Sequence, residues 1–122
     1  MNKAILIVGL PGSGKTHLAK TKYVPDGYVL CDDPTVLDRT LLESGKDVVF
    51  TDPHLCNSDT RRIAEDVLRG YGYEVEWVFF ENNERKAKKL LKFRNDKRII
   101  TNFESFKYVI PPNTTPLEIF EA

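Results

Sequence analysis

The first residues with a recognisable chemistry form a glycine-rich loop near the N-terminus. The stretch GLPGSGKT, a complete G-x-x-x-x-G-K-T pattern, follows an apolar run and precedes a helical one. Glycines let backbone N–H groups curve around a phosphate, the lysine reaches the β- and γ-phosphates, and the threonine hydroxyl ligates Mg²⁺. The loop therefore predicts a site for ATP and Mg²⁺, with Thr16 as metal ligand. The expected binding residues are Gly9, Pro11, Gly12, Ser13, Gly14, Lys15 and Thr16.

Three acidic residues follow two further predicted strands. Asp32 and Asp33 come after the second strand along the chain, and Asp52 comes after the third. Because ligands of a parallel sheet lie beyond the carboxyl ends of its strands, we expect these acids to face the same crevice as the glycine loop. A carboxylate there can accept a proton from an attacking hydroxyl or hold Mg²⁺ through water. For Asp32 and Asp33, the capping of a helix before Pro34 is an equally good interpretation.

A strongly basic segment lies in the last third of the chain. Between Arg85 and Arg98 there are eight basic residues and one acid, a balance of 8 − 1 = +7, in a chain whose net charge is zero. Phosphoryl transfer spreads negative charge over the moving group, and small kinases stabilise it with arginines from a lid. Arg94 and Arg98 are the candidates for that role. The lysines before them are interpreted as a solvated helix face, with contacts to a polyanionic substrate as the alternative.

Alternating strand and helix patterns must position these groups. We expect strands at 3–8, 28–31, 47–51 and 73–80, with 108–110 as the candidate fifth. Helices are expected from the glycine loop to about Lys22, from Pro34 to Gly45, from a cap at Ser58 to Gly70, from Glu84 to about Asp96, and as a closing turn after Pro116. This alternation predicts a three-layer α/β fold of the P-loop kinase type, with a central parallel sheet of four or five strands.

Apolar spacing also predicts which helix faces are buried. The inward residues are expected to be Ile63, Ala64, Val67 and Leu68 in the third helix, and Ala87, Leu90 and Leu91 in the fourth. Early-helix His17, loop residue His54 and core aromatic Trp77 are assigned no role in chemistry.

Length and composition indicate one globular domain that spans residues 1–122. Hydrophobic residues make up 41% of the 122 residues and charged residues 30%, as in ordinary folded proteins. The zero net charge gives no overall attraction to nucleic acid or membrane. No apolar run is long enough to span a membrane and no signal peptide is recognisable, so a cytoplasmic location is expected. Cys31 and Cys56 match no metal spacing and are expected to be reduced, partly buried thiols.

Several of these segments together resemble a known family. GLPGSGKT, LCDDP, VVFTDPHLCNSDTRR, YGYEVEWVFF and KFRNDKR are similar in order and spacing to the kinase domain of phage-type polynucleotide 5′-hydroxyl kinases. The resemblance implies ATP-dependent phosphoryl transfer to the 5′-OH of DNA or RNA. It implies Asp32 as the general base and Asp52 as the acid that orients the acceptor. It also implies Arg94 and Arg98 as the lid arginines, while Lys15 and Thr16 keep their roles in the loop.

The sequence departs from this family in the acceptor region. Where the family has arginines just before the base and three residues after it, this chain has Cys31 and Thr35. The link between the second and third strands, from Pro34 to Lys46, is also short. Arg39 is a candidate replacement as a phosphate ligand, although its spacing fits a surface arginine as well. Asp33 is kept as a further candidate for acceptor binding.

Two other functions are compatible with these residues. A shortened acceptor region suits a kinase of a nucleoside, nucleotide or other small hydroxyl metabolite at least as well as a polymer kinase. A P-loop module that binds or slowly hydrolyses nucleotide and acts through a partner is the second alternative. The lid arginines and Asp32 favour a kinase, since a pure switch has no need of them.

Overall fold

The computed structural model describes residues 2–31, 39–93 and 108–120. Its centre is a parallel sheet of β1 (Lys3–Val8), β2 (Val29–Cys31), β3 (Val48–Phe50) and β4 (Glu74–Phe79), in the spatial order β2-β3-β1-β4. β1 pairs with β4 along its whole length and with β3 from Ala4↔Val48 to Leu6↔Phe50. β1 and β3 are almost wholly buried, which explains their uninterrupted apolar sequences. β1 is therefore an interior strand, between β3 and β4.

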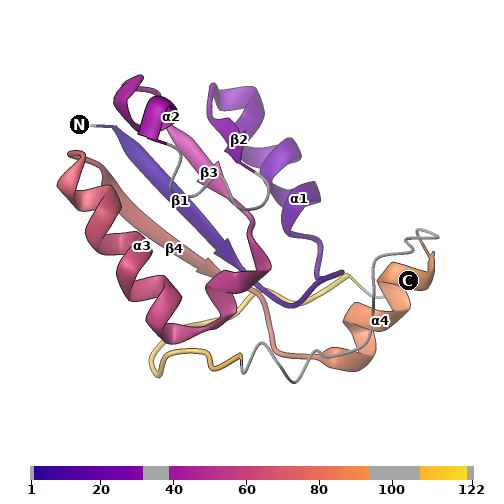
Figure 1. Cartoon of the computed structure of the whole chain (residues 1–122). Coiled ribbons are helices and arrows are strands. Elements are labelled where there is room, and N and C mark those ends of the chain that lie inside the picture. The colour runs from indigo at the N-terminus through magenta and orange to yellow at the C-terminus, as the bar shows by residue number, and fades with distance from the viewer. Residues whose placement is uncertain (1, 32–38, 94–107, 121–122) are drawn as a thin grey trace.

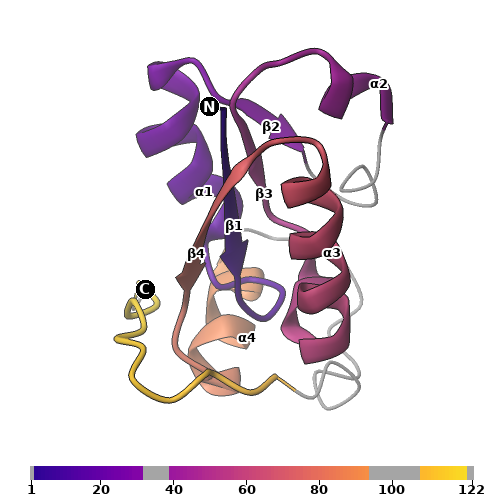
Figure 2. The ribbon, with the colours of Figure 1, turned by 90° about the vertical axis from the view of Figure 1, so that its left-hand side faces the viewer.

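Helices cover both faces of this sheet (Figures 1 and 2). On one face lies α1 (Lys15–Leu18), which continues as helical turns over Ala19–Tyr23 and Val24–Asp26. On the other lie α2 (Arg39–Glu43) and α3 (Ser58–Gly70). α4 (Glu84–Phe93) lies beyond the edge where the strands end. The predicted three-layer α/β fold is therefore confirmed. Within the described part of the chain, no helix is both long and apolar enough to cross a membrane.

The first helical segment extends further than predicted. It was expected to stop before Pro25, but a short turn of helix over Val24–Asp26 includes this proline. Proline is tolerated there because the first residues of a helical turn have no N–H partner within it. Gly27, with a φ of 94°, ends the turn.

Two details of α3 differ from the prediction. Its N-cap is Asn57 and not Ser58, because the Asn57 side chain accepts hydrogen bonds from the N–H groups of Asp59 (2.9 Å) and Thr60 (3.3 Å). Ile63 is 55% exposed and does not face the core. The buried stripe runs through Arg61, Ala64 and Leu68, spaced by three and four residues, and Ile63 falls outside it.

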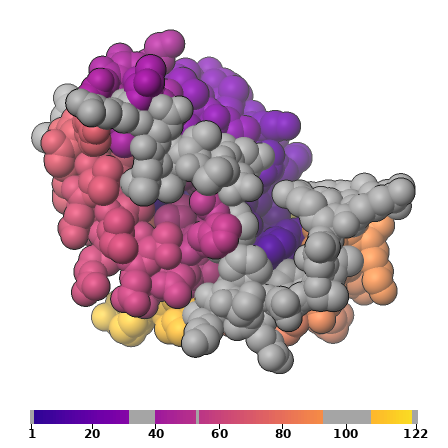
Figure 3. Space-filling model, in the orientation of Figure 1, coloured from indigo at the N-terminus to yellow at the C-terminus, as the bar shows by residue number. Residues whose placement is uncertain are grey.

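The C-terminal segment also corrects two predictions. Residues 108–110 form no strand, because the carbonyl of Tyr108 accepts a bond from the Asn82 side chain and that of Val109 accepts one from Arg61. After Pro116 there is no helical turn. Leu117 instead extends the sheet by a parallel bridge to Phe80, its N–H donating to Phe79 and its carbonyl accepting from Glu81, each at 2.8 Å. In the space-filling view this segment borders the lower end of α3 (Figure 3).

Glu81 joins the end of β4 to both neighbouring segments. Its carboxylate accepts the N–H of Ile119 at 2.9 Å and pairs with Lys86 of α4 at 3.3 Å. The Ile119 N–H is the main reason why the pKa of Glu81 lies below its ordinary value. Ala87, Leu90 and Leu91 of α4 are buried as predicted, so α4 is packed against the end of the sheet.

Candidate active site

The glycine loop crosses from the end of β1 to the start of α1. Gly12 and Gly14 have φ values of 87° and 101°, in the left-handed region that side chains rarely adopt. A Cβ on Gly12 would lie 2.6 Å from both the carbonyl oxygen of Ala87 and the Cγ of Leu91. Only glycine fits at this position, since the loop packs directly on α4.

Lys15 is held within this loop. Its side chain is buried, and its Nζ donates hydrogen bonds to the carbonyls of Gly9 (2.9 Å) and Leu10 (3.0 Å). The Ser13 hydroxyl also donates to Leu10, at 2.6 Å. The loop thus folds around an ammonium group that is already desolvated and positioned. Thr16, the next residue, is half-buried at the start of α1.

The glycine backbone, the buried ammonium and the adjacent hydroxyl are the donor set that a magnesium-bound nucleoside triphosphate requires. The loop amides and Lys15 would hold the phosphates, and the Thr16 hydroxyl would ligate Mg²⁺. The left-handed glycines allow the curvature that such a cradle needs. The residues present therefore fit this group.

Asp52 lies at the neighbouring strand end, after β3. It is buried, with 5% of its surface exposed, and caps a short helical turn over Pro53–Cys56. Its Oδ1 accepts the backbone N–H of His54 at 2.9 Å and lies 2.8 Å from Nδ1 of the same residue. The His54 ring is mostly exposed. His54, for which the sequence predicts no role, therefore orients the Asp52 carboxylate.

Cys56 connects this turn to the glycine loop. Its buried thiol donates a hydrogen bond to the Gly9 carbonyl at 3.2 Å. Burial raises the pKa of the Cys56 thiol to about 11, although the nearby charges of Lys15 and Arg61 oppose the shift. The group thus stays protonated and can donate at neutral pH. Both cysteines are free thiols, but both are buried and not partly buried as predicted.

Arg61 fixes the same turn from the other side. Its buried guanidinium donates to the carbonyls of Leu55 (3.0 Å), Cys56 (2.8 Å) and Val109 (3.0 Å). The guanidinium carbon also lies 5.4 Å from the centre of the Phe79 ring. Arg61 therefore joins the turn after β3, the end of β4 and the C-terminal segment.

A small pocket of about 270 Å³ adjoins the glycine loop on the α1 side. It opens beside Ser13 and Gly14, and most of its wall is apolar. Leu18, Leu90, Leu117 and Phe120 contribute to that wall, while the polar members are Ser13, His17, Thr21 and Glu118. A flat apolar group next to a bound phosphate chain would fit there.

The predicted site residues are distributed unevenly over the described structure. The glycine loop and Asp52 are brought to one edge of the sheet and joined through Cys56 and Gly9. Arg39 begins α2. The other candidates, Asp32, Asp33, Arg94 and Arg98, lie outside the described residues.

Sequence reasoning missed the supporting roles of His54, Cys56 and Arg61. For Arg61 a signal was present, because it shares the helical spacing of Ala64 and Leu68 and so had to point inward. A buried arginine needs several acceptors, and the carbonyls of an irregular turn supply them. His54 and Cys56 gave no comparable signal, since their partners depend on the tertiary fold.

The loop and the sheet order define the class of the fold, a P-loop kinase-like α/β domain. A chain from the PezAT chromosomal toxin-antitoxin system of the human pathogen Streptococcus pneumoniae is similar to it, with a TM-score of 0.62 and 20% sequence identity. The similarity covers 84% of the present chain but 55% of that one, so this protein spans just over half of its length. No known protein-family profile matches the sequence.

A curated relative gives the family. The chain is 30% identical over 104 residues to "Uncharacterized protein R277" of Acanthamoeba polyphaga mimivirus, and the match covers 77% of this chain and 74% of the relative. The protein belongs to the same family as this mimivirus protein.

Proposed function

We propose that this protein is an ATP-dependent phosphotransferase that moves the γ-phosphoryl group to a hydroxyl, preferably the 5′-OH of a polynucleotide. The observation that carries the proposal is the pairing of two strand ends. A glycine loop around the buried Lys15 lies next to a turn that orients the buried Asp52, and the Cys56–Gly9 hydrogen bond joins the two. The resemblance to phage-type polynucleotide 5′-hydroxyl kinases supports the acceptor.

On the nucleotide side, Lys15 interacts with the β- and γ-phosphates and the loop amides surround them. The Thr16 hydroxyl would hold the Mg²⁺ that accompanies ATP, and that ion would supply positive charge to the phosphate oxygens. The pocket beside α1 accommodates the nucleoside, with its base against Leu18 and Phe120. Inorganic tripolyphosphate should therefore compete with ATP far more weakly than ADP does.

On the acceptor side, Asp32 takes the proton of the hydroxyl whose oxygen attacks the γ-phosphorus, while the bond from that phosphorus to ADP breaks. Arg94 and Arg98 stabilise the charge on the moving group. Asp52 orients the acceptor, and His54 holds its carboxylate in place. Asp33 and Arg39 complete the candidate contacts to the acceptor.

The test is transfer of radiolabelled γ-phosphate to 5′-OH oligonucleotides, nucleosides and nucleotides. Asp32→Asn should keep ATP affinity and lower the transfer rate, because an amide preserves size but takes no proton. Asp33→Asn is the matched control. A rate loss in Asp33→Asn with Asp32→Asn unaffected would reassign the base. Release of free phosphate with no labelled acceptor would favour the nucleotide-binding module.

A kinase of a small acceptor is the second candidate, favoured by the short link between β2 and β3, from Cys31 to Val48. Salt dependence separates the two. KM for a polymer should rise steeply with salt because bound lysines and arginines release counterions, and it should rise less after Lys88 and Lys92 are replaced by alanine. A small acceptor predicts weak salt dependence and turnover of a nucleoside at least equal to that of an oligomer.

A further inference from the structure

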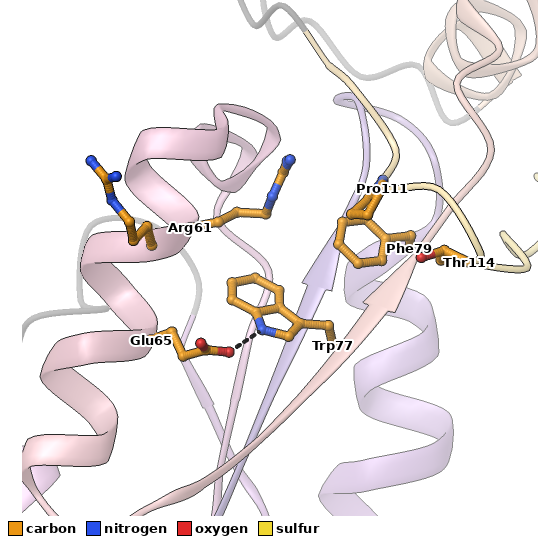
Figure 4. A pocket seen from close by; sticks show the side chains of 7 residues that line it. Arg61, Glu65, Trp77, Phe79, Pro111 and Thr114 are labelled. Atoms are coloured by element: carbon orange, nitrogen blue, oxygen red, sulfur yellow. Dashed lines mark hydrogen bonds between the residues drawn. The ribbon is translucent and has the colours of Figure 1, made fainter.

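A second pocket, of about 440 Å³, lies between α3, β4 and the C-terminal segment (Figure 4). Trp77 and Phe79 of β4 form one side, with ring centres 6.0 Å apart and planes inclined by 21°. Arg61, Arg62 and Glu65 of α3 form the opposite side. Trp77, predicted to be a core aromatic, is only half-buried and lines this open pocket.

The polar groups around Trp77 are arranged for a planar ligand that carries negative charge. The indole N–H donates to Glu65 at 2.7 Å, which fixes the ring and directs its polar edge toward α3. Arg62 is 75% exposed, and its only ion pair among the described residues is a 3.8 Å contact to the equally exposed Asp59. So loose a surface pair contributes little stability and exchanges readily for a phosphate. A fixed aromatic ring in a pocket that an exposed guanidinium also lines is a combination that suits single-stranded nucleic acid.

This pocket adjoins the acceptor side of the candidate active site. Arg61 lines the pocket and at the same time donates to the carbonyls of Leu55 and Cys56, in the turn that Asp52 caps. One side chain thus separates the turn from the pocket. A nucleic-acid strand whose 5′ end lies at Asp52 needs a surface for its following nucleotides, and this pocket is connected to that turn through Arg61.

We propose that this pocket binds a nucleotide of the acceptor strand downstream of its 5′ end, with the base stacked on Trp77 and the phosphate at Arg62. The inference rests on the proposed polynucleotide acceptor, but it concerns binding and can be tested without phosphoryl transfer. It also assigns acceptor contacts to α3 and β4 that compensate for the short β2–β3 link.

Trp77 is the only tryptophan of the chain and therefore reports on its own pocket. The experiment titrates the full chain, without ATP, with thymidine and with 5′-OH oligothymidylates of increasing length, and follows tryptophan fluorescence. Stacking should quench Trp77 with oligomers and not with thymidine. Arg62→Ala should weaken this binding and lower the slope of log affinity against log salt by about 1. Lys20→Ala, which removes one exposed charge from the α1 side of the sheet, should leave it unchanged.

A second variant tests the ring through catalysis. Trp77→Leu should raise KM for the oligomer about fivefold to a hundredfold, while KM for ATP stays constant. Absent quenching, or quenching that Arg62→Ala and Lys20→Ala weaken equally, would overturn the subsite. Quenching without phosphoryl transfer would leave the subsite standing and remove the kinase. Phosphoryl transfer to the oligomer without quenching would support the kinase and overturn the subsite.

Discussion

The loop after β1 and the turn after β3 lie at the same edge of the sheet but are built by different means. Gly9–Thr16 is shaped mainly from within, by left-handed glycines and by bonds from Ser13 and Lys15 to its own carbonyls. The turn around Asp52 is also held from outside, by Arg61 of α3 and by the Cys56 bond to the loop. The first structure is nearly local in sequence, whereas the second exists only when the fold is complete.

This difference separates two kinds of functional position. The loop should retain its shape through changes elsewhere in the domain, because few distant residues define it. The orientation of Asp52 should depend on α3 and on the C-terminal segment, which Arg61 links to it. Substitutions can therefore disturb the proposed acceptor side while leaving the proposed nucleotide site intact.

The largest expected effect is on the rate of phosphoryl transfer when the ammonium group of the glycine loop is removed. Lys15→Ala should lower the rate of phosphoryl transfer by about a hundredfold to a thousandfold, because the ammonium stabilises charge that develops on the phosphates. Circular dichroism should show an intact fold. Near-normal turnover in labelled-phosphate assays would remove the loop from the mechanism.

The next effect tests the external support of the turn. Arg61→Ala should lower the free energy of unfolding by about 3 to 4 kcal/mol, since it leaves the carbonyls of Leu55, Cys56 and Val109 without their donor. Arg61→Lys should recover only part of the lost unfolding free energy, because an ammonium cannot donate to several carbonyls in the planar geometry of a guanidinium. Arg62→Ala, exposed on the same helix, is the control and should change stability by less than about 0.5 kcal/mol. Equal losses in urea denaturation of the two alanine variants would refute this account.

Gly12→Ala tests a position at which the shape of the loop is limited by its packing against α4. The left-handed φ and the 2.6 Å approach to Ala87 and Leu91 together should cost about 3 kcal/mol. Gly70→Ala, at the end of α3, serves as the matched control, because nothing lies within 4 Å of a Cβ added there. Thermal unfolding of both variants should show a large drop for Gly12→Ala alone. Similar melting temperatures would mean that α4 moves to accommodate the added methyl group at little cost.

The smallest effect concerns Cys56 and alkaline pH. Its thiol has a pKa of about 11 in the fold and about 9.0 when unfolded, so between these values the unfolded chain binds fewer protons. Stability should therefore decrease as pH rises through this window, by at most about 3 kcal/mol from this group, a limit reached only above the folded pKa. The measurement is the difference in unfolding free energy between wild type and Cys56→Ala at neutral and alkaline pH. Parallel pH profiles would show that the thiol does not contribute.

The sequence predicted best what depends on local periodicity. β1 and β3 followed from apolar runs and β4 from an alternating pattern, and the buried face of α4 followed from Ala87, Leu90 and Leu91. The glycine loop was recognisable because its pattern constrains eight consecutive positions between a strand and a helix.

The remaining features depend on distant partners. Asn57 and Ser58 are adjacent residues that both favour caps, and only the path of the chain out of the preceding turn decides between them. Residues 108–110 carry an apolar pattern typical of a strand, yet Asn82 and Arg61 take up the carbonyls of Tyr108 and Val109. Such competition from side chains leaves no periodic trace in the sequence.

The close packing of Gly12 on α4 has a consequence for how this family diverges. Selection for folding alone would preserve that glycine, since a methyl group would collide with Ala87 and Leu91 whether or not a nucleotide is bound. Thr16 is half-buried at the start of α1, and its expected role is with Mg²⁺. A descendant that had lost catalysis would therefore keep its second loop glycine for a long time while its threonine drifted. Under the proposed function, substitutions at Thr16 are thus the better marker of lost phosphoryl transfer among relatives.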